Sequence, residues 1–154
     1  MLRVAILADA SIGIGTGHIM RMLTLSLSLR EYANIVFLSR NLEGNLFALV
    51  EEKGYKQQII DSLEVDVEGF DFLIIDHYGV NFVLQQAYKV QLPTMVVDDL
   101  FNTTSSHLLL NHNLYATGEA YKNLIDRDAI CCTGAPYALV QQKFLNLPKV
   151  EKKE

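Results

Sequence analysis

The sequence lacks any long run of apolar residues, and this absence excludes a membrane-spanning helix. The longest apolar stretches hold about five residues, whereas a helix needs about 20 to cross a bilayer. At the N-terminus, the apolar run in MLRVAILADAS is short and is interrupted by Asp9. We therefore interpret this stretch as a core strand rather than a secretory signal, and we expect no stable membrane insertion.

Positive charge is also scarce, which argues against nucleic acid as a partner. The 154 residues include 13 Lys and Arg against 18 Asp and Glu, giving a net charge of −5 with both signs interspersed. No basic arm or face stands out. Half of the residues are apolar and a fifth are charged, so we expect one soluble domain with a substantial core.

Cysteine is nearly absent, which limits both cross-linking and metal binding. Cys131 and Cys132 are adjacent, so they are poorly placed to bridge each other, and no third or fourth thiol exists for a zinc site. We interpret both as buried apolar side chains of a cytoplasmic protein, and we predict no metal and no cofactor.

Short apolar runs that alternate with longer mixed segments make up the rest of the sequence and predict an α/β fold. Candidate strands lie at 2–9, 34–40, 71–76, 94–99, 107–111 and 129–134, with a further short one at 55–61. Candidate helices lie at 18–31, 44–53, 80–90, 118–125 and 137–144. Several strands are apolar on both faces, which is typical of a sheet covered by helices on each side. The alternation predicts a doubly wound, Rossmann-like and mostly parallel sheet.

One segment fits two interpretations. LTLSLSL, residues 23–29, alternates with a period of two and by itself reads as a strand. In a helix, however, Arg21, Thr24, Ser28 and Glu31 fall on one polar face. A strand here would leave no crossover between the strands at 2–9 and 34–40, so we predict a helix.

A glycine-rich turn, GIGTGHIMR at 13–21, links the first predicted strand to this helix. A dinucleotide fingerprint requires G-x-G-x-x-G, but His18 occupies the third glycine position. A phosphate-binding P-loop requires a lysine, and none occurs between Arg3 and Lys53. Neither nucleotide motif is present, although the turn still lies at the sheet edge where α/β proteins bind ligands.

His18 therefore becomes the main candidate for chemistry. At the first turn of a helix, the positive end of the helix favours the neutral imidazole, which can accept a proton from water. Arg21 lies one turn later on the same side, where it can pair with an anionic group. The alternative is that His18 merely caps the helix or bonds a nearby carbonyl.

From this motif onward the sequence resembles the UDP-sugar hydrolases of pseudaminic acid biosynthesis, relatives of MurG-type glycosyltransferases. The matching patches run in order along nearly the whole chain: ADASIGIGTGHIMR, LEGN at 42–45, LIIDHYG at 73–79, VVDD at 96–99, LLNHN at 109–113 and GAPYALVQQKF at 134–144. The activity of that family is the hydrolysis of UDP-2,4-diacetamido-2,4,6-trideoxy-β-L-altropyranose. Leu7 departs from the pattern, since the family commonly has arginine there.

The resemblance implies a GT-B fold, in which two Rossmann-like domains face each other across a cleft. Residues 1–147 resemble the N-terminal domain alone, with 148–154 as the start of a linker or a tail. The resemblance makes His18 the general base that activates water against the anomeric carbon, with release of UDP. It also implies that Gly15 and Gly17 bring backbone close to the sugar and diphosphate, and that Tyr78 lines the sugar site.

Other strand ends supply further candidates. Asp98 and Asp99 are not the separated acidic pair of a metal-dependent transferase, so we expect them to orient His18 or to bond a sugar amide or hydroxyl. Asn111 and Asn113 fit either recognition of an acetamido group or turn formation. His77 fits either the site or a bond to a loop carbonyl, and Tyr137 either pocket or core.

Three functions remain open at this point. The first is the UDP-sugar hydrolase, whose isolated N-terminal domain should be weak or inactive because the missing C-terminal domain holds most of the nucleotide. The second is a MurG-like glycosyltransferase domain, in which His18 deprotonates a sugar hydroxyl instead of water. The third is a non-catalytic half that binds a partner subunit.

Overall fold

The computed structural model describes residues 1–147 of the chain, and the linker or tail predicted at 148–154 lies outside the described residues. The strands are β1 (Leu2–Leu7), β2 (Ala33–Arg40), β3 (Lys56–Ile60), β4 (Phe72–Ile75), β5 (Thr94–Val97), β6 (Leu108–Asn111) and β7 (Ile130–Thr133). The α-helices are α1 (Gly17–Leu29), α2 (Phe47–Glu52), α3 (Phe82–Lys89) and α4 (Gln142–Leu145). Each predicted strand is confirmed, including the short one at 55–61.

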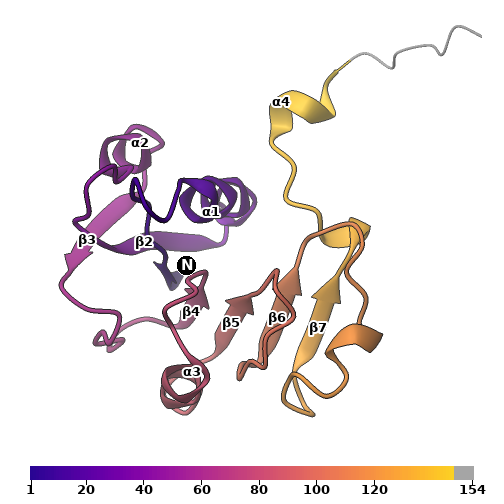
Figure 1. Ribbon diagram of the computed structural model, residues 1–154. Helices are drawn as coiled ribbons and strands as arrows, with labels where there is room; N and C mark the ends of the chain where they lie inside the picture. The colour runs from indigo at the N-terminus through magenta and orange to yellow at the C-terminus, as the bar shows by residue number, and fades with distance from the viewer. Residues whose placement is uncertain (148–154) are drawn as a thin grey trace, which may run out of the picture.

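The strands form one sheet in the order β3-β2-β1-β4-β5-β6-β7, and every neighbouring pair is parallel. The chain starts in the middle of the sheet, runs to one edge, returns to β4 beside β1, and then runs to the other edge (Figure 1). The carboxyl ends of β1 and β4 therefore flank the point where the direction of winding reverses. In open α/β sheets this is where ligands bind.

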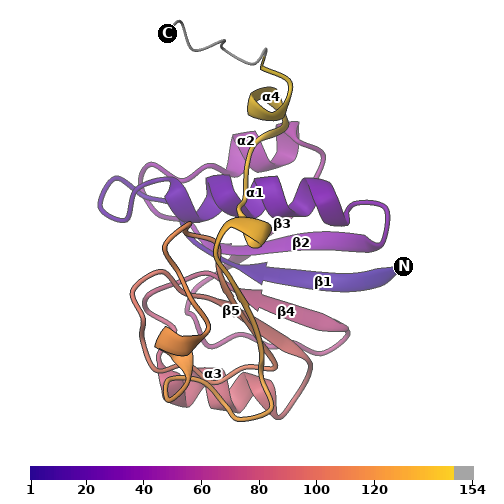
Figure 2. The ribbon, with the colours of Figure 1, turned by 90° about the vertical axis from the view of Figure 1, so that its right-hand side faces the viewer.

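Helices cover both faces of the sheet. α1 and α2 lie on one face and α3 on the other, with the sheet between them (Figure 2). Side chains from successive positions of β1 point alternately to the two layers. Ile6 packs in the α1 and α2 core, and Leu7 packs in the α3 core. This two-sided burial explains why the central strands carry continuous apolar runs.

The alternating segment 23–29 is helical, as predicted. Within α1 the buried residues include Ile19, Met22, Leu23 and Ser26, which recur at the spacing of one helical face. That face packs on β1 and β2. The N-cap residue Thr16 makes no side-chain capping bond, so packing rather than capping stabilises the beginning of α1.

Two predicted helices are much shorter than expected. The segment 118–125 contains only a 3-10 turn, Glu119–Tyr121, anchored by the single buried side chain of Tyr121. The segment 137–144 is interrupted by extended backbone at Ala138 and Gln141. Tyr137, Val140 and Phe144 remain exposed, and only Leu139 packs partly buried against the core. Without a packed apolar stripe, a short helix is marginal. Cys131 and Cys132 are unpaired and only partly buried, because β7 is an edge strand.

Candidate active site

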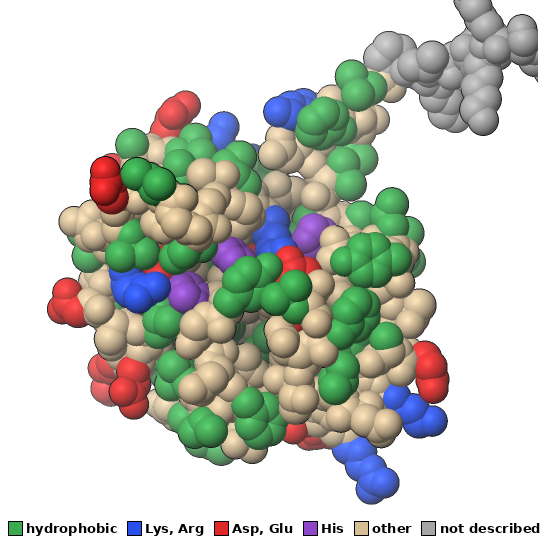
Figure 3. Space-filling model, viewed as in Figure 1, with side chains coloured by type: hydrophobic (Ala, Val, Ile, Leu, Met, Phe, Trp, Pro, Cys, Tyr) green, Lys and Arg blue, Asp and Glu red, His purple; other side chains and the backbone are tan. Residues whose placement is uncertain are grey.

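Most of the predicted site residues gather where β1 and β4 end and α1 begins, whereas Asp98 and Asn111 lie at the ends of β5 and β6. His18 and Arg21 come from the first turns of α1, and Asp76 follows β4 directly. Figure 3 shows purple histidines together with blue and red side chains in one band across this face of the molecule. The band contrasts with the largely apolar and uncharged surface around it.

His18 is held by a buried carboxylate. Its Nδ1 lies 2.6 Å from Oδ1 of Asp76, whose side chain is fully buried. A carboxylate only accepts hydrogen bonds, so we assign the proton to Nδ1, which leaves the lone pair on Nε2. Within residues 1–147, Nε2 makes no hydrogen bond, whereas Nδ1 is engaged. His18 thus bonds a carboxylate rather than capping its helix.

Arg21 joins two carboxylates. Its Nε donates to Oδ2 of Asp76 at 2.5 Å, its Nη2 donates to Oδ1 of the same residue, and its Nη1 donates to Oδ2 of Asp99 at 2.8 Å. Burial alone would lower the pKa of Arg21, but the bonds to Asp76 and Asp99 raise it above its ordinary value. The anionic partners of this guanidinium are therefore residues of the chain itself.

Tyr78 lies between His18 and Asp99. Its ring packs edge-on against the His18 ring, with 4.7 Å between the centroids, and its hydroxyl donates to Oδ1 of Asp99 at 2.8 Å. Partial burial and the bond to Asp99 raise the pKa of Tyr78 to about 12. The residue is still 58% exposed, so it remains accessible to a ligand.

The carboxylate that contacts His18 is not the one expected from the sequence. Asp76 bonds the imidazole, whereas Asp99 bonds Arg21 and Tyr78. Asp76 follows a buried apolar strand, as Asp98 and Asp99 do. Position after a strand therefore does not identify which of the three aspartates is the partner of His18. The distinguishing signal is strand order: β4 lies beside β1 and therefore beside the start of α1.

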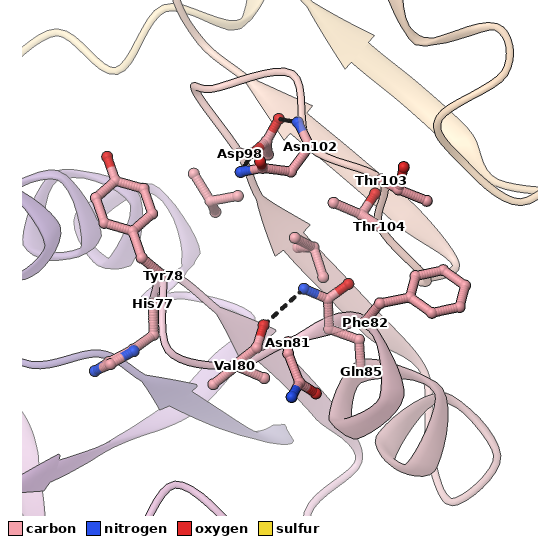
Figure 4. Close-up of a pocket in the computed structure, with 12 residues that line it drawn as sticks. His77, Tyr78, Val80, Asn81, Phe82, Gln85, Asp98, Asn102, Thr103 and Thr104 are labelled. Atoms are coloured by element: carbon pink, nitrogen blue, oxygen red, sulfur yellow. Dashed lines mark hydrogen bonds between the residues drawn. The ribbon is translucent and has the colours of Figure 1, made fainter.

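Asp98 and Asn111 are engaged inside the protein. Both are buried, and both contact the hydroxyl of Tyr121, which donates to Asp98 and accepts from Asn111. Asp98 also accepts bonds from the backbone and side chain of Asn102 (Figure 4), while Asn111 accepts from Asn113. These contacts organise the loops behind the site.

A second histidine–aspartate pair, His77 and Asp9, lies beside the pair of His18 and Asp76. This second pair was not assigned from the sequence. His77 donates from Nε2 to Oδ2 of Asp9 at 2.8 Å, and Asp9 also accepts bonds from the backbone and Nε of Arg40 at 2.7 Å each. The rings of His18 and His77 are nearly parallel, at 11°, with centroids 6.5 Å apart. Asp9 lies shortly after β1, which ends at Leu7, and Asp76 directly follows β4.

The glycine-rich turn packs against the LEGN segment at 42–45, which is another of the patches that carry the family resemblance. Ser11 and Gly15 exchange backbone hydrogen bonds across the turn, and Gly15 has a φ of +85°, which favours glycine. The N–H of Ile12 donates to the carbonyl of Glu43, so the LEGN segment holds the turn. Gly17 has open space where a side chain would begin, which leaves room for a ligand near His18.

A pocket of about 280 Å³ opens on the other side of Tyr78, between α3 and the loop after β5. Its lining includes Val80, Phe82, Thr103 and Thr104 (Figure 4). Among residues 1–147, no group of three or more His, Cys, Asp and Glu side chains is placed to hold a metal ion. In the same range, no helix is long and apolar enough to cross a membrane.

Comparison with known proteins agrees with the sequence motifs. No family model matches the chain. The chain is 30% identical over 149 residues to the UDP-2,4-diacetamido-2,4,6-trideoxy-beta-L-altropyranose hydrolase of Campylobacter jejuni. The match covers 93% of this chain and 53% of that hydrolase, so the chain spans about half the length of its relative. This similarity supports membership of that hydrolase's family, and the parallel seven-stranded sheet fits the N-terminal half of a GT-B fold.

Proposed function

We propose that this chain, a relative of a UDP-sugar hydrolase, is the base-carrying domain of such an enzyme and uses His18 to activate water. The observation that carries the proposal is the pairing of His18 with buried Asp76 through Nδ1, which leaves Nε2 unbonded at the edge of the sheet. A positioned base of this kind contributes about 10²–10⁴ in rate.

In the proposed reaction, Nε2 of His18 takes a proton from a water molecule as the oxygen attacks the anomeric carbon. The bond from that carbon to the diphosphate oxygen breaks, UDP leaves on the opposite side, and the configuration inverts. Asp76 then stabilises the imidazolium, since its carboxylate contacts the protonated Nδ1. UDP is a good leaving group, so a second carboxyl group acting as a general acid is not required.

The substrate contacts we propose come from surfaces that are still open. The exposed ring of Tyr78 faces the sugar, and the backbone around Gly15 and Gly17 approaches the sugar and diphosphate. Arg21 fixes Asp76 and Asp99 and offers a ligand only its remaining N–H groups. Direct contact by Asp98 or Asn111 would require breaking their bonds to Tyr121, so we place both in support of the site.

The proposed enzyme needs a second part to hold most of the nucleotide, which accords with a relative about twice as long. We therefore expect weak or no turnover from residues 1–154 alone. Robust turnover by this chain alone would contradict the half-site proposal. A separate nucleotide-binding chain that restores activity would show instead that the site is split between subunits.

The test compares His18→Ala with wild type in the complete enzyme, with His107→Ala as the matched control. His107 lies at the opposite, amino edge of β6. We expect a loss of at least about 100-fold for His18→Ala and little change for the control. Near-normal rates for His18→Ala would reduce His18 to a structural residue.

Product analysis in H₂¹⁸O separates the candidate reactions. Hydrolysis at the anomeric carbon places ¹⁸O in the free sugar and none in UDP. Label in UDP would mean attack at phosphorus and would exclude the proposed step. Formation of a disaccharide would indicate the MurG-like glycosyltransferase, in which the same base acts on a sugar hydroxyl.

A further inference from the structure

The two neighbouring histidines are held in opposite ways. His18 contacts its carboxylate through Nδ1 and leaves Nε2 unbonded within the described part of the chain, 1–147. His77 contacts its carboxylate, Asp9, through Nε2 and uses Nδ1 to accept a bond from the backbone N–H of Gly79 at 2.8 Å. Both ring nitrogens of His77 are therefore occupied, and its side chain is only 7% exposed. His77 is arranged to hold the loop after β4 in place rather than to exchange a proton.

The bond from Gly79 to His77 closes a short loop around Tyr78. The imidazole acts as the acceptor in a turn of the kind that asparagine and aspartate side chains form with the backbone two residues later. The side chains of His77 and Tyr78 leave this loop in different directions (Figure 4). His77 thus faces Asp9 while Tyr78 faces His18 and Asp99.

Gly79 fits the His77 ring closely. A Cβ built on Gly79 would lie 2.9 Å from Cε1 and 3.0 Å from Nδ1 of His77, and 2.8 Å from Cδ1 of Leu63. These distances are shorter than ordinary contacts, so any side chain at position 79 would displace the imidazole. The close packing leaves the turn around Tyr78 little freedom.

Asp9 anchors the turn to the centre of the sheet. Its carboxylate is fully buried and accepts from the backbone and Nε of Arg40 as well as from His77. β1 is a central strand with β2 and β4 on its two sides. The loop after β4 is therefore tied, through one imidazole, to the ends of β1 and β2.

We propose that His77 is a positioning residue that fixes Tyr78 against the His18 base mainly by accepting the bond from Gly79, while its bond to Asp9 adds a secondary anchor. The proposal rests on the proposed function in one respect, namely that Tyr78 forms the wall of the sugar site. The turn itself, which the imidazole closes by accepting the bond from Gly79, does not depend on any enzymatic activity.

Three substitutions separate the two bonds of His77. In His77→Asn, Oδ1 takes the place of Nδ1 and keeps the bond from Gly79. In His77→Gln, Nε2 takes the place of the ring Nε2 and keeps the bond to Asp9. In His77→Leu, both bonds are lost while similar volume remains. Each variant is measured for kcat and KM in the complete enzyme and by NMR in the chain described here.

We expect His77→Leu to lower kcat/KM by about 10- to 100-fold, because small displacements of a positioning group have effects of this size. We expect His77→Asn to recover most of that loss and His77→Gln to recover little. A general structural role would instead follow stability, so thermal unfolding of all three variants is measured in parallel. Equal losses in His77→Asn and His77→Leu at equal stability would overturn the proposal.

NMR tests the geometry independently of catalysis. In wild type, we expect the ¹⁵N shifts of His77 to report a proton on Nε2 and an accepting lone pair on Nδ1, and the Gly79 amide to exchange slowly with solvent. We expect fast exchange at Gly79 in His77→Leu and slow exchange in His77→Asn. A proton on Nδ1, or fast exchange in wild type, would overturn the proposal even if the enzyme is active. Conversely, a protein that shows the expected NMR signature but no hydrolysis would contradict only the proposed function.

Discussion

His18 and Arg21 share one buried carboxylate, that of Asp76. The imidazole reaches Oδ1 through Nδ1 at 2.6 Å, while the guanidinium bonds both oxygens. The guanidinium holds the carboxylate in place, and the carboxylate orients the ring. Since His18 and Arg21 are one helical turn apart on α1, the first two turns of a single helix meet the end of β4 as a unit.

Replacing Asp76 with Asn tests this arrangement. An asparagine carbonyl can still accept from Nδ1, but it lacks the charge that stabilises the imidazolium formed during the reaction. We expect kcat of the complete enzyme to fall by at least about 10-fold, with a smaller change in KM. Asp128→Asn is the control, because its side chain is 79% exposed and, among residues 1–147, its ion pair is with Lys89. An unchanged kcat would mean that Asp76 serves Arg21 alone.

Replacing Arg21 with Met tests stability. The substitution leaves buried Asp76 and half-buried Asp99 without their cation, and removing one partner of a buried pair is costly. We expect the free energy of unfolding to fall by roughly 3 kcal/mol, measured by urea denaturation. Arg127→Met, at an exposed position, should change it by less than about 0.5 kcal/mol. Equal free energies of unfolding for wild type and Arg21→Met would show that the ion pairs of Arg21 make no net contribution to stability.

The strands and the first helix could be predicted because their signals are local. Central strands buried on both faces carry continuous apolar runs, and the crossover between β1 and β2 required a helix, which was predicted at 18–31 and is observed at Gly17–Leu29. Short helices near the C-terminus could not be predicted as reliably. There the sequence allowed a helix over 118–125, but one buried anchor, Tyr121, supports only a single turn.

The site could be predicted in part. His18 stood out because a histidine replaced a glycine in a recognisable turn. Its partner Asp76 is 58 residues away, and their contact depends on β4 pairing with β1 rather than with another strand. The same is true of His77 and Asp9, 68 residues apart. Contacts between strand ends follow from strand order, which a single sequence does not encode locally.

The hydroxyl of Tyr78 should stay protonated well into the alkaline range. Partial burial and its bond to Asp99 raise its pKa to about 12, so below that pH it remains a donor to Asp99. The raised value also means that its contribution to folding stability is complete below pH 10 and is lost as the pH rises through about 12.

The measurement for Tyr78 is a titration of ¹³C-tyrosine signals by NMR, with Tyr78→Phe identifying the resonance. The Tyr78 signal should change only as the pH rises through about 12. Ionisation of Tyr78 near the ordinary tyrosine value of 10.0 would show that its bond to Asp99 does not persist in solution.

Acid should weaken the fold through two aspartates of the site. Burial alone would raise the pKa of Asp9 and of Asp99. Bonds from His77 and Arg40 lower the value of Asp9, and bonds from Arg21 and Tyr78 lower that of Asp99. Both therefore contribute stability that is complete above 3.8, their ordinary pKa, and is lost as the pH falls through their folded-state values.

We expect urea denaturation to report falling stability below about pH 4, with a shallower slope in Asp99→Asn than in wild type. Asp128→Asn should keep the wild-type slope, because that side chain is largely exposed. Parallel slopes for Asp99→Asn and wild type would mean that Asp99 titrates alike in the folded and unfolded chain.

The backbone hydrogen bond from Ile12 to Glu43 attaches the glycine-rich turn to a different part of the molecule from the one that holds the histidines. Asp9 and Asp76, which bond the two imidazoles, follow the central strands β1 and β4, whereas the glycine-rich turn bonds another surface segment. We therefore expect residues 12–16 and 42–45 to tolerate substitution together without disturbing the two histidine–aspartate pairs. Relatives with altered sugar preferences should therefore differ first in this paired rim and last in the aspartates at its base.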